Sequence, residues 1–202
     1  MNYKEPIFQF KQPLINTQDQ PGIFHLSWGR DRTLLATYYT CLDQALLLWA
    51  WCVAVIFTVA QFSPIDWYCQ AIAWSSLSVV ATLMTNWLTW EWAQIKNLRW
   101  IIYCWSGLML GGVCLTDYGI FSGNPLILIN LCPLWLGVSA LGYGVTAGGM
   151  RSRALALVGL FHLGAIAALP WLISWQFLLT GSVIASSLLF LSILQWDHEV
   201  GT

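Results

Sequence analysis

Charged side chains are scarce in this sequence. Of its 202 residues, only 8% are Asp, Glu, Lys or Arg, whereas 58% are hydrophobic. A soluble domain carries about 25% charged residues, so this chain cannot cover a water-facing surface and lipid must cover most of it. The net charge is −1, with only eight Lys and Arg residues. Nucleic-acid binding needs a basic patch, so we expect no nucleic-acid partner.

Motifs for catalysis and metal binding are also missing. There is no glycine-rich phosphate loop, no HExxH and no GxSxG, so nothing points to an enzyme. None of the six cysteines forms a CxxC pair, and zinc needs clustered ligands. We therefore expect no metal site and interpret the cysteines as small buried hydrophobes. A Cys69–Cys114 disulfide is the open alternative, because both residues lie near the same end of their helices.

Long apolar runs dominate the chain. A membrane-spanning helix needs about 20 mostly apolar residues, and backbone groups in hydrocarbon must be paired within their own segment. The runs therefore predict an all-α membrane protein, a bundle of about six transmembrane helices. Six runs have sufficient length: 44–62, 66–89, 99–117, 125–147, 153–173 and 175–196.

The last two runs are joined very tightly near Ser174. A re-entrant pair therefore remains an alternative to two full crossings. Pro170 is expected to end or kink the fifth helix, because proline cannot donate the helical hydrogen bond.

The positions of the cations predict the orientation. In a six-helix arrangement, all eight Lys and Arg residues fall in the N-terminal segment, the second loop and the fourth loop, on one face of the membrane. The positive-inside rule makes that face cytoplasmic, so both termini are predicted to be cytoplasmic. The eight are Lys4, Lys11, Arg30, Arg32, Lys96, Arg99, Arg151 and Arg153. We assign Arg99, Arg151 and Arg153 as membrane-surface anchors.

These predictions divide the chain into three parts. Residues 1–43 form a cytoplasmic N-terminal segment, 44–196 the transmembrane bundle, and 197–202 a short cytoplasmic tail. From about Ser27 the N-terminal segment has helical spacing. Two interpretations stay open: a helix lying along the membrane interface, or a cytoplasmic extension of the first transmembrane helix.

Ionisable residues inside spans usually mark function, because they are costly in lipid. Here no Asp, Glu, Lys or Arg maps to mid-membrane depth, which argues against a proton- or sodium-coupled transporter and against a voltage sensor. His162 is the exception, in the middle of the fifth run. It is a neutral imidazole bonded to a neighbouring helix, a ligand to the metal of haem or chlorophyll, or a proton carrier. The other histidines, His25 and His198, are in the tails, so no cofactor is predicted and the pigment remains the alternative.

Other polar groups in the spans are candidates for packing or for a polar path. Asn86 and Asn130, with Gln70 and Gln176, are expected to bond between helices. The second run is rich in hydroxyls, which either line a path or bond their own backbone: Ser75, Ser76, Ser78, Thr82, Thr85 and Thr89. GxxxG pairs, which allow close helix approach, occur at Gly107–Gly111 and Gly144–Gly148.

Residues 124–150, NPLILINLCPLWLGVSALGYGVTAGGM, and the tail WDHEVGT carry a resemblance. The Asn-Pro start, the Pro133–Gly137 stretch and the small-residue end are similar to an uncharacterised family of integral membrane proteins from cyanobacteria and plastids, with a domain of unknown function. The chain departs from that family after the fourth run, where an acidic, cysteine-containing loop is expected. The resemblance implies a bacterial inner or thylakoid membrane and no known activity.

Three functions remain as hypotheses. The first is an accessory subunit or assembly factor that packs against a larger membrane complex, favoured by the bare spans and short loops. The second is a transporter or channel for a small neutral or lipid-like solute, with a polar cavity around His162, Asn86 and the hydroxyls of the second run. The third is a pigment-binding protein or membrane enzyme that uses His162.

Overall fold

The computed structural model describes residues 6–10 and 40–197. The helix expected from Ser27 onward and residues 198–202 lie outside this part. Within these residues, six helices of 16 residues or more form a bundle with a short helix, a 3₁₀ helix and two short strands. In chain order the elements are β1 Phe8–Phe10, α1 Cys41–Phe62, α2 Trp67–Ile95, α3 Arg99–Ser122, α4 Pro125–Leu128, α5 Leu131–Met150, α6 Arg153–Ala168, the 3₁₀ helix η1 Leu169–Trp175, α7 Gln176–Ile193 and β2 Leu194–Trp196.

Five helical segments among the described residues are long and apolar enough to cross a membrane. Four of them are α1, α2, α3 and α5, and the fifth is the 41-residue stretch Arg153–Ile193 that contains α6, η1 and α7. Large apolar side chains stand on the outside of the bundle, among them Trp51, Trp87 and Trp171, which are 71%, 69% and 81% exposed. Water would disfavour such a surface and lipid would cover it. The described part of the chain is thus all-α in its bundle, and its helices are long and apolar enough for a multi-pass membrane protein, as expected from composition.

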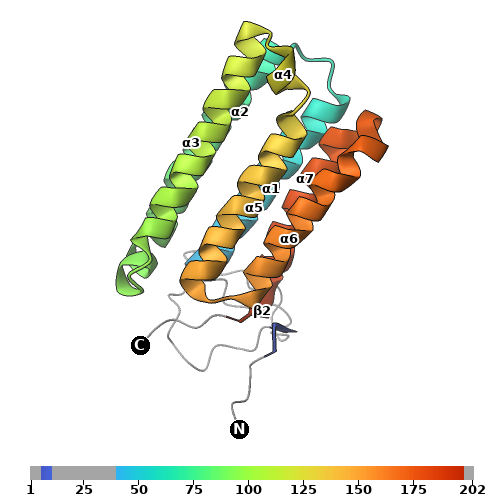
Figure 1. Cartoon of the computed structure of the whole chain (residues 1–202). Coiled ribbons are helices and arrows are strands. Elements are labelled where there is room, and N and C mark those ends of the chain that lie inside the picture. The colour runs from blue at the N-terminus through green and yellow to red at the C-terminus, as the bar shows by residue number, and fades with distance from the viewer. Residues whose placement is uncertain (1–5, 11–39, 198–202) are drawn as a thin grey trace, which may run out of the picture.

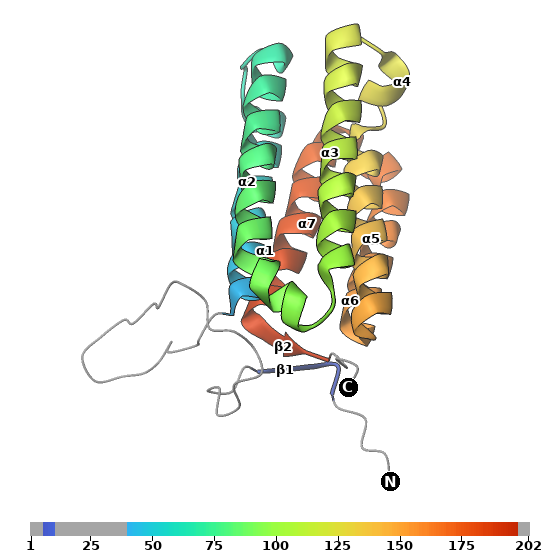
Figure 2. The same cartoon turned by 90° about the vertical axis from the view of Figure 1, so that its left-hand side faces the viewer.

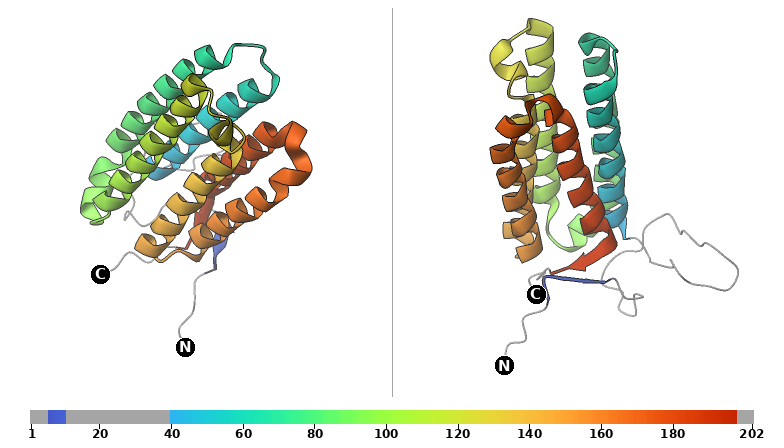
Figure 3. Two further views of the ribbon diagram at one scale, coloured as in Figure 1. Left: turned by 45° about the horizontal axis from the view of Figure 1, so that its top comes forward. Right: turned by 90° about the vertical axis from the view of Figure 1, so that its right-hand side faces the viewer.

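The helices run up and down the bundle in turn (Figure 1). α2 pairs with α3, α5 pairs with α6, and α7 returns to lie along α1. Contact between α3 and α5 joins the first half of the chain to the second. The views in Figure 3 show η1 reversing the chain, so that α7 runs back beside α6 and against α1. The first and last helices of the bundle are thus neighbours.

Side-chain caps fix where several helices begin. Thr40 and Asp43 form a capping box, in which each side chain accepts from the other residue's backbone N–H. Asp66 accepts from the N–H of Tyr68 at the start of α2. Ser152 accepts from the N–H of Leu155 at the start of α6. These bonds satisfy backbone donors that have no partner inside the helix.

The fourth apolar run, 125–147, is divided rather than continuous. Its first turn is α4, and α5 begins only at Leu131. Pro133 lies in the first turn of α5, where its missing N–H costs nothing, but its ring would clash with the carbonyl of Ile129 if one helix continued through both. Asn130 lies in this break and donates to the carbonyl of Leu126 at 2.8 Å.

The last two runs also end earlier than predicted. α6 ends at Ala168, and Pro170 is the second residue of η1, in agreement with its expected role as a helix terminator. Leu172 has non-helical backbone angles, φ −126° and ψ 38°, and the chain turns there. Gln61 of α1 holds this turn by donating to the carbonyl of Ser174 at 2.9 Å and accepting from the N–H of Leu178 at 3.2 Å.

The prediction of helix up to residue 196 was wrong for its last three residues. Leu194–Trp196 form β2, which pairs antiparallel with β1, with Phe8 opposite Trp196. The ring of Phe8 packs against that of Phe190, at 5.2 Å between centroids. The pairing partner lies almost 190 residues away in the chain, so the local apolar pattern of the run could not reveal it. Figure 2 shows this small sheet across one end of the bundle.

The cations of the described residues gather at the same end as the sheet. The turn between α2 and α3 carries Lys96 and Arg99, and the turn between α5 and α6 carries Arg151 and Arg153. Asn97 and Arg151 have positive φ values of 56° and 49° in these two turns. Both cationic turns therefore lie at one end of the bundle.

Candidate functional site: a cavity within the bundle

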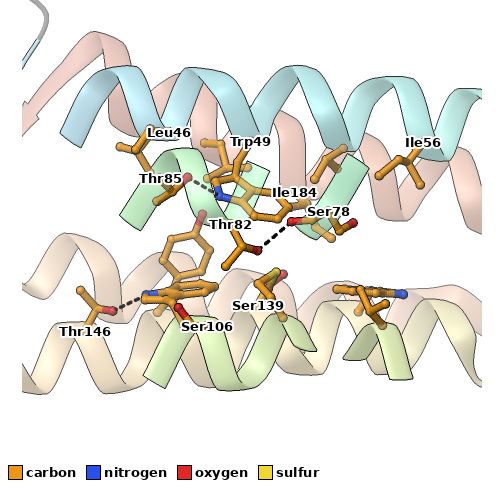
Figure 4. Close-up of a pocket in the computed structure, with 18 of the residues that line it drawn as sticks. Leu46, Trp49, Ile56, Ser78, Thr82, Thr85, Ser106, Ser139, Thr146 and Ile184 are labelled. Carbon is orange, nitrogen blue, oxygen red and sulfur yellow. Dashed lines mark hydrogen bonds between the residues drawn. The ribbon is translucent and has the colours of Figure 1, made fainter. Parts of the chain in front are cut away.

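A cavity of about 220 Å³ lies between α1, α2, α3, α5 and α7. Most of its wall is apolar, and six tryptophans contribute to it. Figure 4 shows side chains from these helices pointing toward a common space, with Leu46, Ile56 and Ile184 among them. An apolar cavity of about 150 Å³ in another protein holds a benzene molecule. This cavity therefore has room for one ring with a short substituent.

The hydroxyl-rich face of α2 lines the cavity. Ser76 is the exception, because it is exposed and donates to its own helix at Ile72. Thr82 and Thr89 also donate to carbonyls of α2, at 2.7 and 2.8 Å, which satisfies their protons. Asn86 bonds Ser106 of α3 at 3.0 Å. Much of this polar surface is thus already paired.

Three hydroxyls in the cavity wall are not paired. Ser78 of α2 and Ser139 and Tyr143 of α5 are only 5%, 6% and 3% exposed, and all three line the cavity. Within the described part of the chain, none of their hydroxyl oxygens has a hydrogen-bond partner. A buried hydroxyl without a partner costs about 1–3 kcal/mol. These groups are therefore available to a bound molecule with polar atoms of its own.

Tryptophan–threonine hydrogen bonds join the helices around the cavity. The indole N–H of Trp49 on α1 donates to Thr85 of α2 at 2.9 Å. Between α3 and α5 the bonds are reciprocal. Trp105 of α3 donates to Thr146 of α5 at 2.9 Å, and Trp135 of α5 donates to Thr116 of α3 at 3.2 Å. A buried indole N–H needs such a partner, and here it sets how adjacent helices align.

The reciprocal contact rests on a spacing that occurs twice in the sequence. On both α3 and α5 a Trp is followed by Gly after seven positions and by Thr after eleven: Trp105, Gly112 and Thr116, then Trp135, Gly142 and Thr146. Each Trp ring lies over the glycine of the other helix, so a Cβ added at Gly142 would lie 2.6 Å from Trp105 ring atoms, and one at Gly112 would lie 3.0 Å from the Trp135 ring. Our sequence interpretation missed this repeat, although its spacing was visible.

Asp117 lies at the end of the cavity away from the β1–β2 sheet. It accepts from the hydroxyl of Ser75, with both carboxylate oxygens 2.8 Å from the Ser75 Oγ. Among the described residues that line the cavity it is the only carboxylate, and none of them is Lys, Arg or His. The sequence had placed Asp117 only at a helix end, and its position in the cavity wall comes from the structure.

His162 does not join the cavity. Its side chain is fully buried, at 0% exposed, and its ring centroid lies 5.2 Å from that of Tyr143. Its Nδ1 is 2.8 Å from the carbonyl of Val158, so Nδ1 carries the proton and Nε2 is an acceptor. Nε2 has no partner among the described residues. The enclosed ring offers no open face, so a haem or chlorophyll could reach Nε2 only if the surrounding helices separated.

The predicted constellation of His162, Asn86 and the α2 hydroxyls is thus brought together only in part. Asn86 and most of the hydroxyls face the cavity, whereas His162 lies behind Tyr143. Asn130 is exposed at the break before α5 and donates to Leu126 four residues earlier, so the prediction that it bonds between helices was wrong. Gln70 is buried and donates to the carbonyl of Ile65 at 2.6 Å, so it bonds locally rather than across helices.

The predicted GxxxG pairs do not lie where two helices of the bundle approach each other closely. A Cβ added at Gly107, Gly111, Gly144 or Gly148 would meet no atom within 4 Å. Close approach between α5 and α6 occurs instead at Gly159, where a Cβ would lie 3.2 Å from the carbonyl oxygen of Ala140. A GxxxG pattern identifies small residues, but it does not identify which face of the helix meets a neighbour.

The cysteines remain free thiols. Cys69 and Cys114 are both exposed and do not form a disulfide. The open alternative of a bridge between them is therefore wrong. The expectation of buried thiols is met by Cys41, Cys52 and Cys132, but it is wrong for Cys69 and Cys114, which are exposed, and for Cys104, which is partly exposed.

Arg153 forms an ion pair with a carboxylate, and Arg99 and Arg151 are exposed at the same cationic end. Its Nε is 2.7 Å from Asp197, the residue after β2. Asp197 also accepts from the N–H of Ala154 at 2.9 Å and from the hydroxyl of Ser152 at 3.2 Å. Burial alone would raise the pKa of Asp197, but these hydrogen bonds outweigh it and lower the pKa below the ordinary value. The carboxylate thus joins the end of the chain to the start of α6.

Comparison with protein-family models, with curated proteins and with solved structures finds no match. The resemblance to a cyanobacterial and plastid membrane family therefore stays a prediction. The function has to be argued from the cavity and its residues.

Proposed function

We propose that this protein binds a small, mostly apolar solute inside its transmembrane bundle. The supporting observation is the set of unpaired hydroxyls of Ser78, Ser139 and Tyr143 in the wall of an otherwise apolar cavity. Small-molecule sites have this composition, with an apolar lining and a few polar groups that orient the ligand. The proposal retains the solute-accepting cavity of the transporter-or-channel hypothesis drawn from the sequence, without its His162 component.

The proposed orientation places the cationic turns and the small sheet in the cytoplasm, with six crossings. It is supported by the position of Lys96, Arg99, Arg151 and Arg153 at one end of the bundle and by the positive-inside rule. A bacterial inner membrane or a thylakoid membrane is the setting that the sequence resemblance implies.

The accessory-subunit hypothesis stays a prediction. Its support is the apolar outer surface, but lipid covers the same side chains equally well. Solute binding rests on a more specific feature, because unpaired buried hydroxyls need a polar partner and lipid outside the bundle does not reach them.

The test is binding of 3-phenylpropanol to the full chain in phosphatidylcholine nanodiscs, followed by isothermal titration calorimetry and by tryptophan fluorescence. One ring, a short chain and a hydroxyl match the size and polarity of the cavity. We expect saturable binding that Ser139→Leu abolishes, because the larger side chain fills the space. Tyr143→Phe should weaken binding about fivefold, since a hydrogen bond contributes about 1 kcal/mol.

The matched control is Ser76→Leu, the same substitution at an exposed position of α2, which should leave binding unchanged. Non-saturable partitioning, equal in all variants and in empty nanodiscs, would show that the lipid and not the cavity takes up the alcohol. That result would contradict the proposal.

A further inference from the structure

Asp117 has an unusual position for a carboxylate. It contributes to the wall of an apolar cavity, and its single hydrogen-bond donor in the described part of the chain is the hydroxyl of Ser75. A carboxylate has about four acceptor sites, so most of its capacity is unused. No described Lys, Arg or His lies in the cavity wall to neutralise it.

Two tryptophans that line the cavity are placed by residues next to Ser75 and Asp117 in the sequence. Trp74, the neighbour of Ser75, lines the cavity. The indole of Trp135 is held at Thr116, the residue before Asp117, by its hydrogen bond. The faces of indole rings attract cations, and a carboxylate attracts them more strongly where the dielectric constant is low. Negative charge and aromatic surface therefore occur together at this end of the cavity.

One of the unpaired hydroxyls, that of Ser78, lies one helical turn from Ser75, the partner of the carboxylate. Ser78 is three residues after Ser75 on α2, about 4.5 Å along the helix axis. Ser78 and, across the cavity, Ser139 are more than nine-tenths buried and have no partner among the described residues. One molecule could therefore reach both the carboxylate and the hydroxyl of Ser78.

We propose that the solute carries a protonated amine, with the ammonium group at Asp117 and an apolar body against the tryptophans. This inference rests on the proposed function and names its ligand class. An ammonium group donates up to three hydrogen bonds, and a hydrogen bond between charged groups is stronger than a neutral one. The alternative, in which Asp117 only fixes α3 to α2 through Ser75, is an outcome of the test.

The experiment compares three probes with one skeleton, 3-phenylpropylamine, 3-phenylpropanol and 3-phenylpropanoate, at pH 7 in phosphatidylcholine nanodiscs. We expect the amine to bind about tenfold tighter than the alcohol or better, since hydrogen bonds to charged groups contribute about 1.5–3 kcal/mol, and the carboxylate to bind weakest. Asp117→Asn retains the size of the side chain and its bond to Ser75. In that variant the amine should fall to the affinity of the alcohol, while the alcohol changes less than twofold.

Glu91→Gln is the matched control. It removes the same charge from an exposed position of α2 that does not line the cavity, and the preference for the amine should persist. Equal affinity of the wild-type protein for amine and alcohol would overturn the inference but not the proposed function. An equal loss of amine binding in Asp117→Asn and Glu91→Gln would also overturn it, because it would indicate general charge attraction. If none of the probes binds, the proposed function itself fails, and the inference fails with it.

Discussion

Replacing Gly142 by alanine tests whether the reciprocal Trp–Gly–Thr contact holds α3 against α5. A Cβ added at Gly142 would lie 2.6 Å from Cζ2 and Cζ3 of Trp105, far inside contact distance. The ring cannot move freely, because its N–H is bonded to Thr146 and it makes a T-shaped contact with the ring of Tyr143, with centroids 5.6 Å apart. Either α3 and α5 separate or the Trp105–Thr146 hydrogen bond breaks.

The expected cost follows from these contacts. Overpacking costs about 1–3 kcal/mol, and a lost hydrogen bond adds about 0.5–1.5 kcal/mol. Alanine regains about 0.5–1 kcal/mol relative to glycine within a helix. We therefore expect Gly142→Ala to lower the free energy of unfolding by roughly 1–3 kcal/mol.

The assay is unfolding by sodium dodecyl sulfate in mixed micelles, followed by far-UV circular dichroism, with near-UV dichroism to report the tryptophans. The control is Gly137→Ala on the same helix, where a Cβ meets nothing within 4 Å, and it should not destabilise. Gly112→Ala, with 3.0 Å to the Trp135 ring, should fall between the two. Equal stability of all three variants would refute the packing that we describe.

Two further predictions concern the ends of the bundle. Asp197→Asn should lower the free energy of unfolding by about 1 kcal/mol at pH 7. The folded-state pKa of Asp197 lies below its ordinary value of 3.8. The stabilisation by the carboxylate is therefore fully present above the ordinary pKa and is lost as the pH falls through the folded-state pKa. Unfolding curves should therefore separate wild type from variant at pH 7 and converge below about pH 4, whereas a difference constant with pH would contradict the role of the carboxylate. Gln61→Leu removes the hydrogen bonds to Ser174 and Leu178. It should speed amide hydrogen exchange at Leu178 without changing exchange in β2. An exchange rate at Leu178 that is the same in the variant as in the wild type would contradict this prediction.

The predictability of the fold differed from element to element. Run length located every long helix, because lipid demands about 20 apolar residues wherever a helix crosses. Run length could not place the break before α5, which depends on where the ring of Pro133 would meet a carbonyl. It also could not find β2, because the partner strand at Phe8–Phe10 is remote in sequence.

The candidate site was predictable to a smaller extent. The hydroxyls of α2 were visible as a cluster, and most of them line the cavity. Ser139, Tyr143 and Asp117 were not visible as a site, because the faces of α3 and α5 that meet are set by contacts between helices. The repeated Trp, Gly and Thr spacing contained that information, since it specifies which ring lies over which glycine.

The arrangement of the whole chain in the membrane is tested most directly by the sidedness of its turns. An epitope tag inserted after Asn97, after Gly123 or after Arg151 can be probed with antibody in sealed vesicles of known orientation. We expect the tags after Asn97 and Arg151 to be accessible from the cytoplasmic side only, and the tag after Gly123 from the opposite side only. Accessibility of the Asn97 and Arg151 tags from opposite sides would contradict the account.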